Sequence, residues 1–212
     1  MDADENPFGH RYWEERYGEP GHTWSGNPNA VLVTEASGLV PGRALDIGSG
    51  EGGDAIWLGS LGWTVTGVDI ASNALDKARR QARSVDADAA KRIEWEQHDL
   101  TEWSPAPGTF DLVSSQFMHL PEPHRTTLFR GLAAAVAPGG TLLVVGHDAT
   151  DPDESGHRAH LEALMFSAED VVRAIDGTGL AVIVAESRAR EGDARHGHGT
   201  VHDIVVRAQR PL

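Results

Sequence analysis

The sequence predicts an α/β fold built on one mostly parallel sheet, and three observations support this. Short apolar runs of strand character alternate with segments whose apolar residues recur at helical spacing. The apolar run at residues 43–47 breaks into glycines and then restarts as a helix, as in the first unit of a nucleotide-binding βαβ motif. Only a loop separates the last two strand-like segments, so we expect one antiparallel strand near the sheet edge.

The expected elements follow in chain order. Pro28 and Asn29 supply a helix start, and Ser72 or Asn73 can cap a later helix. Strands are expected at residues 43–47, 63–69, 93–99, 110–115, 141–146, 180–187 and 200–207. Helices are expected at residues 29–38, from about 52 to 62, from 72 or 73 to beyond 82, at 123–136, and from 167 onward. The charged segment 188–199 is predicted to be a loop.

Composition limits the class of protein. The chain has 212 residues, of which 40% are hydrophobic and 24% charged, as expected for a single globular domain. Its formal net charge of −14 disfavours a nucleic-acid partner, because phosphate backbones are repelled by an acidic surface. No apolar run approaches the roughly 20 residues of a membrane span, the acidic N-terminus lacks a signal-peptide pattern, and there is no cysteine. We therefore expect a cytoplasmic protein.

Three acids end the first three predicted strands: Asp46, Asp69 and Asp99. In open α/β sheets, ligands bind at the carboxyl ends of the strands, near the point where the strand order reverses. Asp69 lies roughly 20 residues beyond the glycines, where a carboxylate can accept hydrogen bonds from both ribose hydroxyls. This position suits NAD and S-adenosylmethionine equally well.

Asp46 distinguishes the two ligands. A dinucleotide places an anionic pyrophosphate over the glycine turn, and a carboxylate at the end of the first strand repels it. S-adenosylmethionine instead brings a sulfonium and an ammonium group to that place, and Asp99 can accept from its adenine amine. Gly48, Gly50 and Gly53 still satisfy the dinucleotide pattern G-x-G-x-x-G, so an NAD-dependent oxidoreductase remains the alternative.

The motifs as a set resemble those of a known family. They are residues 44–69, His98-Asp99-Leu100, residues 110–114 and residues 137–143, in order and at the expected spacings over about residues 40–147. This set resembles the class I S-adenosylmethionine-dependent methyltransferases. The resemblance implies a Rossmann-like three-layer sandwich, with a seven-stranded, mostly parallel sheet whose last strand is antiparallel. It also implies a methyltransferase domain over residues 41–212, preceded by an N-terminal cap over residues 1–40.

The resemblance also implies the residues of a cofactor site. Gly48, Ser49 and Gly50 would contact the methionine part, and Asp69 the ribose. Ile70 would flank the adenine, Asp99 would bond its amine, and Leu100 would cover its ring. The predicted cofactor residues are Trp24, Asp46, Gly48, Ser49, Gly50, Asp69, Ile70, His98, Asp99, Leu100, Ser115 and Gln116.

The N-terminal pattern of Trp13, Tyr17 and Trp24 is similar to the branch that contains thiopurine and tellurite-resistance methyltransferases. By that likeness, Trp24 would lie near the sulfonium, where an aromatic face attracts a cation by about 0.5–2 kcal/mol. The alternative is that these tryptophans anchor an N-terminal helix by packing. A lid would comprise residues 1–28 and the polar insertion 147–166.

The 11 histidines raise the question of a metal site. The close pairs His157/His160 and His196/His198 fall in polar loops without a third ligand at a suitable spacing, so we predict no metal site. His119 and His147 each follow a strand whose end faces the predicted cofactor, and either could be a general base for the acceptor. Alternatively, His119 is a turn residue before Pro121, and His147 makes a hydrogen bond that supports the site.

The sequence thus predicts a methyltransferase that moves the methyl group of S-adenosylmethionine to a small-molecule acceptor by in-line displacement. The segment after the fourth strand, Ser114-Ser115-Gln116-Phe117, departs from the Asn/Asp-Pro-Pro-aromatic motif of amino-methylating nucleic-acid enzymes. A non-catalytic S-adenosylmethionine-binding protein is a second alternative. We expect a monomer or a homodimer without nucleic-acid or membrane partners.

Overall fold

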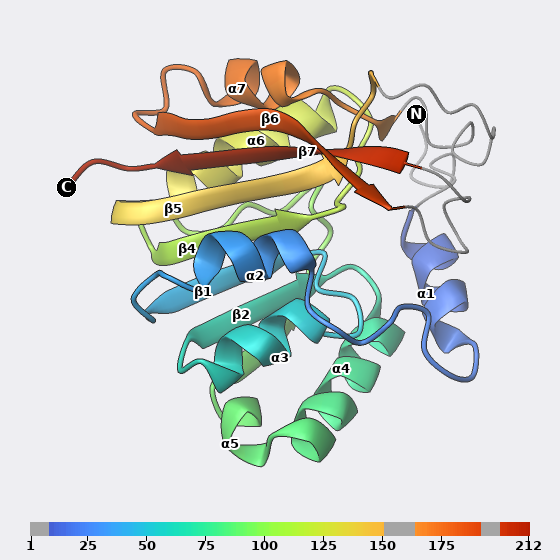
Figure 1. The fold of residues 1–212 in the computed structure, drawn as a ribbon. Helices are drawn as coiled ribbons and strands as arrows, with labels where there is room; N and C mark the ends of the chain where they lie inside the picture. The colour runs from blue at the N-terminus through green and yellow to red at the C-terminus, as the bar shows by residue number, and fades with distance from the viewer. Residues whose placement is uncertain (1–8, 151–163, 192–199) are drawn as a thin grey trace.

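The computed structural model of the protein describes residues 9–150, 164–191 and 200–212. A seven-stranded sheet with the order β3-β2-β1-β4-β5-β7-β6 lies at its centre (Figure 1). Strand β7 runs antiparallel to both of its neighbours, and the remaining pairs are parallel. The α/β fold with one antiparallel strand, predicted from the alternation of elements, is confirmed.

The sheet is built from strands β1 (Arg43–Ile47), β2 (Thr64–Asp69), β3 (Ile93–Gln97), β4 (Phe110–Gln116), β5 (Val136–His147), β6 (Ala181–Glu191) and β7 (Thr200–Gln209). The helices are α1 (His10–Gly18), α2 (Ala30–Ala36), α3 (Gly53–Ser60), α4 (Ser72–Val85), α5 (Ala87–Ala90), α6 (His124–Ala135) and α7 (Ala168–Ile175).

Helices cover both faces of the sheet and make the fold a three-layer sandwich (Figure 1). Successive residues of a strand point to opposite faces, so the apolar run of β5 supplies both layers of core. Leu142 and Val144 pack in the cluster that contains residues of α6 and α7, whereas Leu143 and Val145 pack with α2 and α3. This two-sided burial is the reason why β5 is a continuous apolar run.

The glycine turn follows β1 at the point where the strand order reverses, between β1 and β4. Its last residue, Gly52, has a φ of +86° and is the N-cap residue that precedes α3. A Cβ atom at Gly52 would lie 2.5 Å from the Trp95 ring, so this position needs glycine for its conformation and for its space. The turn is therefore held tightly against the end of the sheet.

Two local predictions are wrong, besides shifts at element boundaries such as that of β5, which begins at Val136 and not at residue 141. Residues 188–191 continue β6, because β7 pairs with them in unbroken register from Arg188/Asp203 to Glu191/Thr200. The start of α4 is capped neither by Ser72 nor by Asn73, since Ala71 is the N-cap residue and has no side-chain cap. Asn29 does cap α2 as predicted.

The capping group of α4 comes from a distant helix. The carboxylate of Glu14 in α1 accepts from Ser72 Oγ at 2.6 Å and from the Asn73 backbone nitrogen at 3.3 Å. These contacts dock α1 beside the carboxyl ends of the strands (Figure 1). The N-terminal segment thereby reaches the edge of the sheet where ligands bind in this class of fold.

Some predictions concern residues outside the described ranges. The histidine pairs His157/His160 and His196/His198 lie outside them, as does most of the insertion 147–166. Within the described ranges, no group of three or more His, Cys, Asp or Glu side chains could hold a metal ion. None of the helices in these ranges is long and apolar enough to cross a membrane.

Candidate functional site

The predicted acids of β1 and β2 lie buried beside the glycine turn. Asp46 is 1% exposed and Asp69 is 7% exposed. The Asp69 carboxylate accepts from the backbone nitrogens of Gly50 at 2.8 Å and Ala71 at 2.9 Å. Asp69 therefore joins the turn after β1 to the segment after β2, and it fixes the shape of the site.

Three acidic side chains, Asp46, Asp54 and Asp69, influence one another's ionisation at this turn. Burial, followed by the charges of Asp54 and Asp69, raises the pKa of Asp46 well above its ordinary value. Burial also raises the pKa of Asp54 to about 6 and raises the pKa of Asp69. Because these three carboxyl groups cannot easily all ionise at once, a positively charged ligand beside them is favoured.

Several buried polar atoms around the turn have no hydrogen-bond partner within the described part of the chain. They are Asp46 Oδ2, Ser49 Oγ, Ser115 Oγ and Gln116 Oε1. Buried polar groups are nearly always paired, so these four atoms need a particular explanation. All four residues belong to the predicted cofactor set, and they come from the ends of β1 and β4. A polar ligand held at the turn would supply the absent partners.

The residues predicted to contact the adenine are Ile70, Asp99 and Leu100, and they differ in exposure and in hydrogen bonding. Asp99 is exposed, and its Oδ1 accepts from the backbone nitrogen and hydroxyl of Thr101 at 2.9 and 2.7 Å. Leu100 is buried, whereas the Ile70 carbonyl accepts from Gln97 at 2.9 Å. The Asp99 carboxylate and the Leu100 side chain thus follow β3 at the same edge of the sheet as Asp69.

His98 is engaged by its own neighbours. Its ring stacks on Trp103 with centroids 4.4 Å apart, and its Nε2 lies 2.9 Å from Glu96 Oε2. These contacts give His98 a packing role in the structure as it stands. The prediction that it contacts the cofactor stays a prediction.

Trp24 and Tyr17 close over the glycine turn. Trp24 Nε1 donates to the Tyr17 hydroxyl at 2.8 Å, and a Cβ atom on Gly50 would lie 2.9 Å from that hydroxyl and 3.7 Å from the Trp24 ring. Burial raises the pKa of Tyr17, which keeps the phenol neutral as an acceptor. The Arg16 guanidinium lies 5.4 Å from the centroid of the Trp24 ring. The N-terminal segment therefore covers the turn.

Another buried acid, Glu51, anchors this segment, and the sequence reasoning missed it. Glu51 accepts from the backbone nitrogens of Thr23 at 2.9 Å and Trp24 at 3.0 Å, and it lies 3.2 Å from Lys77 Nζ. Burial alone would raise the pKa of Glu51, but these hydrogen bonds and the lysine lower it. The sequence offered one signal for the role of Glu51, which is an acidic residue within a glycine-rich turn.

The two candidate bases lie side by side at the ends of β4 and β5. The rings of His119 and His147 stack with centroids 5.1 Å apart, and His119 Nε2 accepts from the His147 backbone nitrogen at 3.4 Å. His147 Nδ1 lies 3.2 Å from Asp203 Oδ1 of β7. Phe117, whose φ of +53° is rare for a residue with a side chain, brings its ring within 4.8 Å of the His147 ring.

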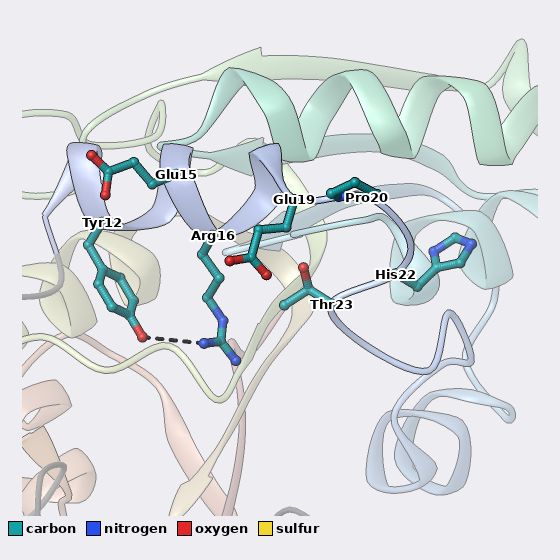
Figure 2. A pocket seen from close by; sticks show the side chains of 7 residues that line it. All are labelled: Tyr12, Glu15, Arg16, Glu19, Pro20, His22 and Thr23. Carbon is teal, nitrogen blue, oxygen red and sulfur yellow. Dashed lines mark hydrogen bonds between the residues drawn. The ribbon is translucent and has the colours of Figure 1, made fainter.

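A polar cavity of about 440 Å³ opens beside α1 (Figure 2). The side chains of Tyr12 and Arg16 extend from α1 to the same side, joined by a 3.5 Å hydrogen bond. Glu19 and Thr23 line the cavity farther along the chain. The sequence reasoning did not identify this cavity, because its walls come from a helix and an irregular loop.

The order of the sheet, the turn after β1 and the acids at the strand ends define a Rossmann-like ligand-binding protein. Residues 44–140 match the family model described as a methyltransferase domain. Residues 44–140 are thus similar to a methyltransferase domain, as the motifs predicted, and the curated relatives that the chain matches are methyltransferases. The likeness to the thiopurine and tellurite-resistance branch stays a prediction.

Two curated relatives illustrate the match. The chain is 32% identical over 127 residues to trans-aconitate 2-methyltransferase from Rhizobium meliloti, covering 58% of this chain and 46% of that protein. It is 33% identical over 140 residues to ubiquinone biosynthesis O-methyltransferase from Paracidovorax citrulli, covering 63% of this chain and 56% of that one. The chain thus spans about half the length of these relatives.

Solved structures share the fold. A structure concerned with conversion of a disulfide bond into a thioacetal group during echinomycin biosynthesis has a TM-score of 0.74 and 21% identity, covering 95% of this chain and 92% of that one. Magnesium protoporphyrin IX methyltransferase from Synechocystis, solved with bound S-adenosylhomocysteine, has a TM-score of 0.64 and 20% identity, covering 85% and 79% of the two chains. At these identities the likeness supports the fold.

Proposed function

We propose that this protein transfers the methyl group of S-adenosylmethionine to a small-molecule acceptor. The observation that carries the proposal is a set of buried polar atoms without partners at the carboxyl ends of β1 and β4: Asp46 Oδ2, Ser49 Oγ, Ser115 Oγ and Gln116 Oε1. Leaving a polar atom buried and unpaired costs about 1–3 kcal/mol. A fold that keeps four such atoms at one edge of its sheet is explained by a ligand that pairs with them.

The residues at this edge fit S-adenosylmethionine. The crowded carboxylates of Asp46 and Asp69 suit its positive charge and its ribose hydroxyls. Ser49, Ser115 and Gln116 supply hydroxyl and amide groups for its methionine part. When bound, S-adenosylmethionine supplies a methyl group on a positively charged sulfur, which accepts the electron pair of the broken bond. The protein then has to position the acceptor in line and exclude water.

We propose that residues 1–40 act as the cap of the site and residues 41–212 as the methyltransferase domain. The contact of Trp24 and Tyr17 with Gly50 supports this division, as does the anchoring of Thr23 and Trp24 by Glu51. In this arrangement the cap keeps water away from the turn. The Trp24 ring, whose face already attracts the Arg16 cation, is suited to a positively charged sulfur.

The test is calorimetry with S-adenosylmethionine on the wild type and two kinds of variant. Asp69→Ala should abolish binding, but it also removes the acceptor of the Gly50 and Ala71 nitrogens. Ser115→Ala is the sharper variant, because it removes a buried hydroxyl without a partner. We expect it to weaken binding while leaving the free energy of unfolding unchanged or higher. Ser60→Ala, at a hydroxyl near the surface, is the control.

The alternatives predict other results. An NAD-dependent oxidoreductase would bind NADH, seen as quenching of tryptophan fluorescence, and would ignore S-adenosylmethionine. A non-catalytic binding protein would bind S-adenosylmethionine and turn over none of a broad panel of thiols, amines, phenols and chalcogen oxyanions. The carboxylate of Asp46 beside the turn disfavours the dinucleotide, and the family match favours methyl transfer.

Other sequence-based predictions stay predictions. The net charge of −14 supports a small-molecule acceptor over a nucleic acid. A cytoplasmic location and a monomeric or homodimeric state rest on the sequence alone. Size-exclusion chromatography with light scattering would decide the oligomeric state.

A further inference from the structure

The histidines at the end of the sheet lie beside a buried carboxylate that the sequence reasoning did not single out. Asp203 is 3% exposed, and it is the register partner of His147 in the antiparallel pair of β5 and β7. Side chains of register partners lie on the same face, so the two meet, with His147 Nδ1 3.2 Å from Asp203 Oδ1. Because β7 is antiparallel, its first residues lie at the edge where β4 and β5 end.

Arg190 completes this arrangement from β6. Its Nε donates to Asp203 Oδ2, and its Nη2 donates to Asp203 Oδ1 at 3.4 Å. Burial alone would raise the pKa of Asp203, but the hydrogen bonds from His147 and Arg190 lower it. Asp203 is therefore ionised at neutral pH and accepts from the ring of His147. An Nδ1–H bonded to a carboxylate leaves Nε2 as the nitrogen that carries the lone pair.

His119 is in a different state, although it is stacked on His147. Burial, and then the charge of His147, lowers the pKa of His119 to about 3. Its Nε2 lone pair accepts from the His147 backbone nitrogen at 3.4 Å, so His119 contributes to the structure of the turn. The two candidates from the sequence are thus distinguished by their partners.

We propose that Asp203 and Arg190 position His147 as a general base that takes a proton from a hydroxyl group of the acceptor. The inference rests on the proposed methyl transfer and names its substrate class. In the step, the O–H proton passes to His147 Nε2, and the oxygen uses the electron pair it keeps to form a bond to the methyl carbon, whose bond to sulfur would break with its electron pair left on sulfur. A phenol-like hydroxyl, with a pKa near 10, keeps its proton at neutral pH and needs such a base, whereas a thiol ionises more readily.

The groups that set the proton affinity of this base come from several elements. The ionised Asp203 faces His147 from β7, and Arg190 lies beyond it on β6. His119 faces it from the loop after β4, Asp148 follows it in the chain, and Arg125 of α6 acts on His119. The nearest of these charges is the carboxylate. Loss of that carboxylate should therefore make His147 a weaker base.

The first test needs no cofactor and no acceptor. Nitrogen-15 spectra of the histidine rings, assigned with His147→Gln, report which nitrogen of His147 carries the proton. We expect the Nδ1–H tautomer in the wild type and its loss in Asp203→Asn. An Nε2–H tautomer in the wild type, or an unchanged tautomer in Asp203→Asn, would overturn the proposal.

The second test is kinetic and uses S-adenosylmethionine with catechol and a series of ring-substituted phenols. Asp203→Asn and His147→Gln should lower kcat by about 10²–10⁴-fold. The loss should be smallest for 4-nitrophenol, which is already ionised at neutral pH. In Asp203→Asn, the ascending limb of the pH profile should move to lower pH, which a purely structural role would not cause.

The matched control is Glu35→Gln. Glu35 pairs with Arg188 of β6 at 2.7 Å and with Arg207 of β7 at 3.1 Å, so the variant disturbs the same two strands without touching His147. It should keep the wild-type tautomer and kcat. If the wild type binds S-adenosylmethionine but methylates none of the phenols, the hydroxyl class is wrong. If the wild type fails to bind S-adenosylmethionine, the proposed function fails first.

Discussion

Asp46, Asp54 and Asp69 surround the start of α3 and share one physical problem. Asp46 and Asp69 are buried and Asp54 is half-buried, and removal from water raises the pKa of each of them, with the pKa of Asp54 reaching about 6. In the unfolded chain the pKa of Asp54 is near 3.8. The free protein therefore holds the extra proton between these values and loses stability as the pH rises through them. A bound cation offsets this loss by favouring the ionised carboxylates.

This linkage predicts proton release on binding. Near pH 6, S-adenosylmethionine should displace protons from the Asp46, Asp54 and Asp69 cluster, and its affinity should rise between about pH 5 and 7. S-adenosylhomocysteine lacks the positive charge on sulfur and should displace fewer. Calorimetry in buffers of different ionisation enthalpy measures the number of protons. Equal release by the two compounds would show that the carboxylates do not sense the sulfonium.

Gly50 offers a second prediction at the same scale. Its φ is +52°, and an added Cβ would lie 2.9 Å from the Tyr17 hydroxyl. Gly21 also has a positive φ, of +89°, but nothing lies within 4 Å of the added atom. Both alanine variants should lose about 1–2 kcal/mol of stability from the backbone conformation. Only Gly50→Ala should also weaken S-adenosylmethionine binding, because it displaces Tyr17 and Trp24 from the turn.

Urea unfolding and calorimetry on the two alanine variants separate these effects. Equal S-adenosylmethionine affinities for Gly50→Ala and Gly21→Ala would mean that the cap does not depend on its contact at Gly50. A lower affinity for Gly50→Ala alone would tie the position of the Tyr17 hydroxyl to the site.

At the scale of elements, α1 is held in place by the capping interaction that it makes with the start of α4. The Glu14 carboxylate bonds Ser72 and Asn73 at the start of α4, and capping interactions of this kind contribute about 0.5–2 kcal/mol. Glu14→Gln should lower the free energy of unfolding by about that amount and speed hydrogen exchange in α1. The exposed neighbour Glu15 provides the control variant Glu15→Gln. Similar losses in both variants would assign the effect to charge rather than to the cap.

The elements differ in how far the sequence predicted them. The strand Arg43–Ile47 and its turn were predicted because their signals are local: an apolar run, an acid and glycines in a row. The same holds for Asp69 and for the capping of α2 by Asn29. The cap of α4 was missed, because Glu14 reaches across 58 positions of the chain to Ser72. No local pattern encodes such a contact.

The residues of the site were likewise predicted where their signals are local in the sequence and missed where they depend on long-range contacts. The residues proposed to bind the cofactor lie at or just after the ends of strands, so local patterns in the sequence could name Ser49 and Gln116. The Asp203–His147 pair joins positions 56 apart, and it depends on the register between β5 and β7. An acid inside the expected strand at residues 200–207 was the signal that the sequence offered. The register between β5 and β7 cannot be derived from the sequence of the two strands alone.

At the scale of the whole molecule, Lys77 links the N-terminal segment to α4 and to the glycine turn. Lys77 of α4 donates to the carbonyls of Glu19 and Gly21 at 3.0 and 2.7 Å and pairs with Glu51 at 3.2 Å. Glu51 in turn accepts from the backbone nitrogens of Thr23 and Trp24. The N-terminal segment, the glycine turn and α4 therefore share one network of hydrogen bonds and an ion pair around Glu51 and Lys77.

Hydrogen exchange at the Thr23 and Trp24 amides should report the opening of this network. Lys77→Met should speed exchange there, because the Glu51 carboxylate loses its cation and the loop carbonyls lose their donor. Lys91→Met, which removes a lysine paired with Asp88 at 2.8 Å on the surface, should leave it unchanged. In the wild type, bound S-adenosylhomocysteine should slow exchange at both amides, since the cap would then close over a filled site. Faster exchange with S-adenosylhomocysteine bound would mean that the cofactor displaces the cap, and the role of residues 1–28 as a lid would be wrong.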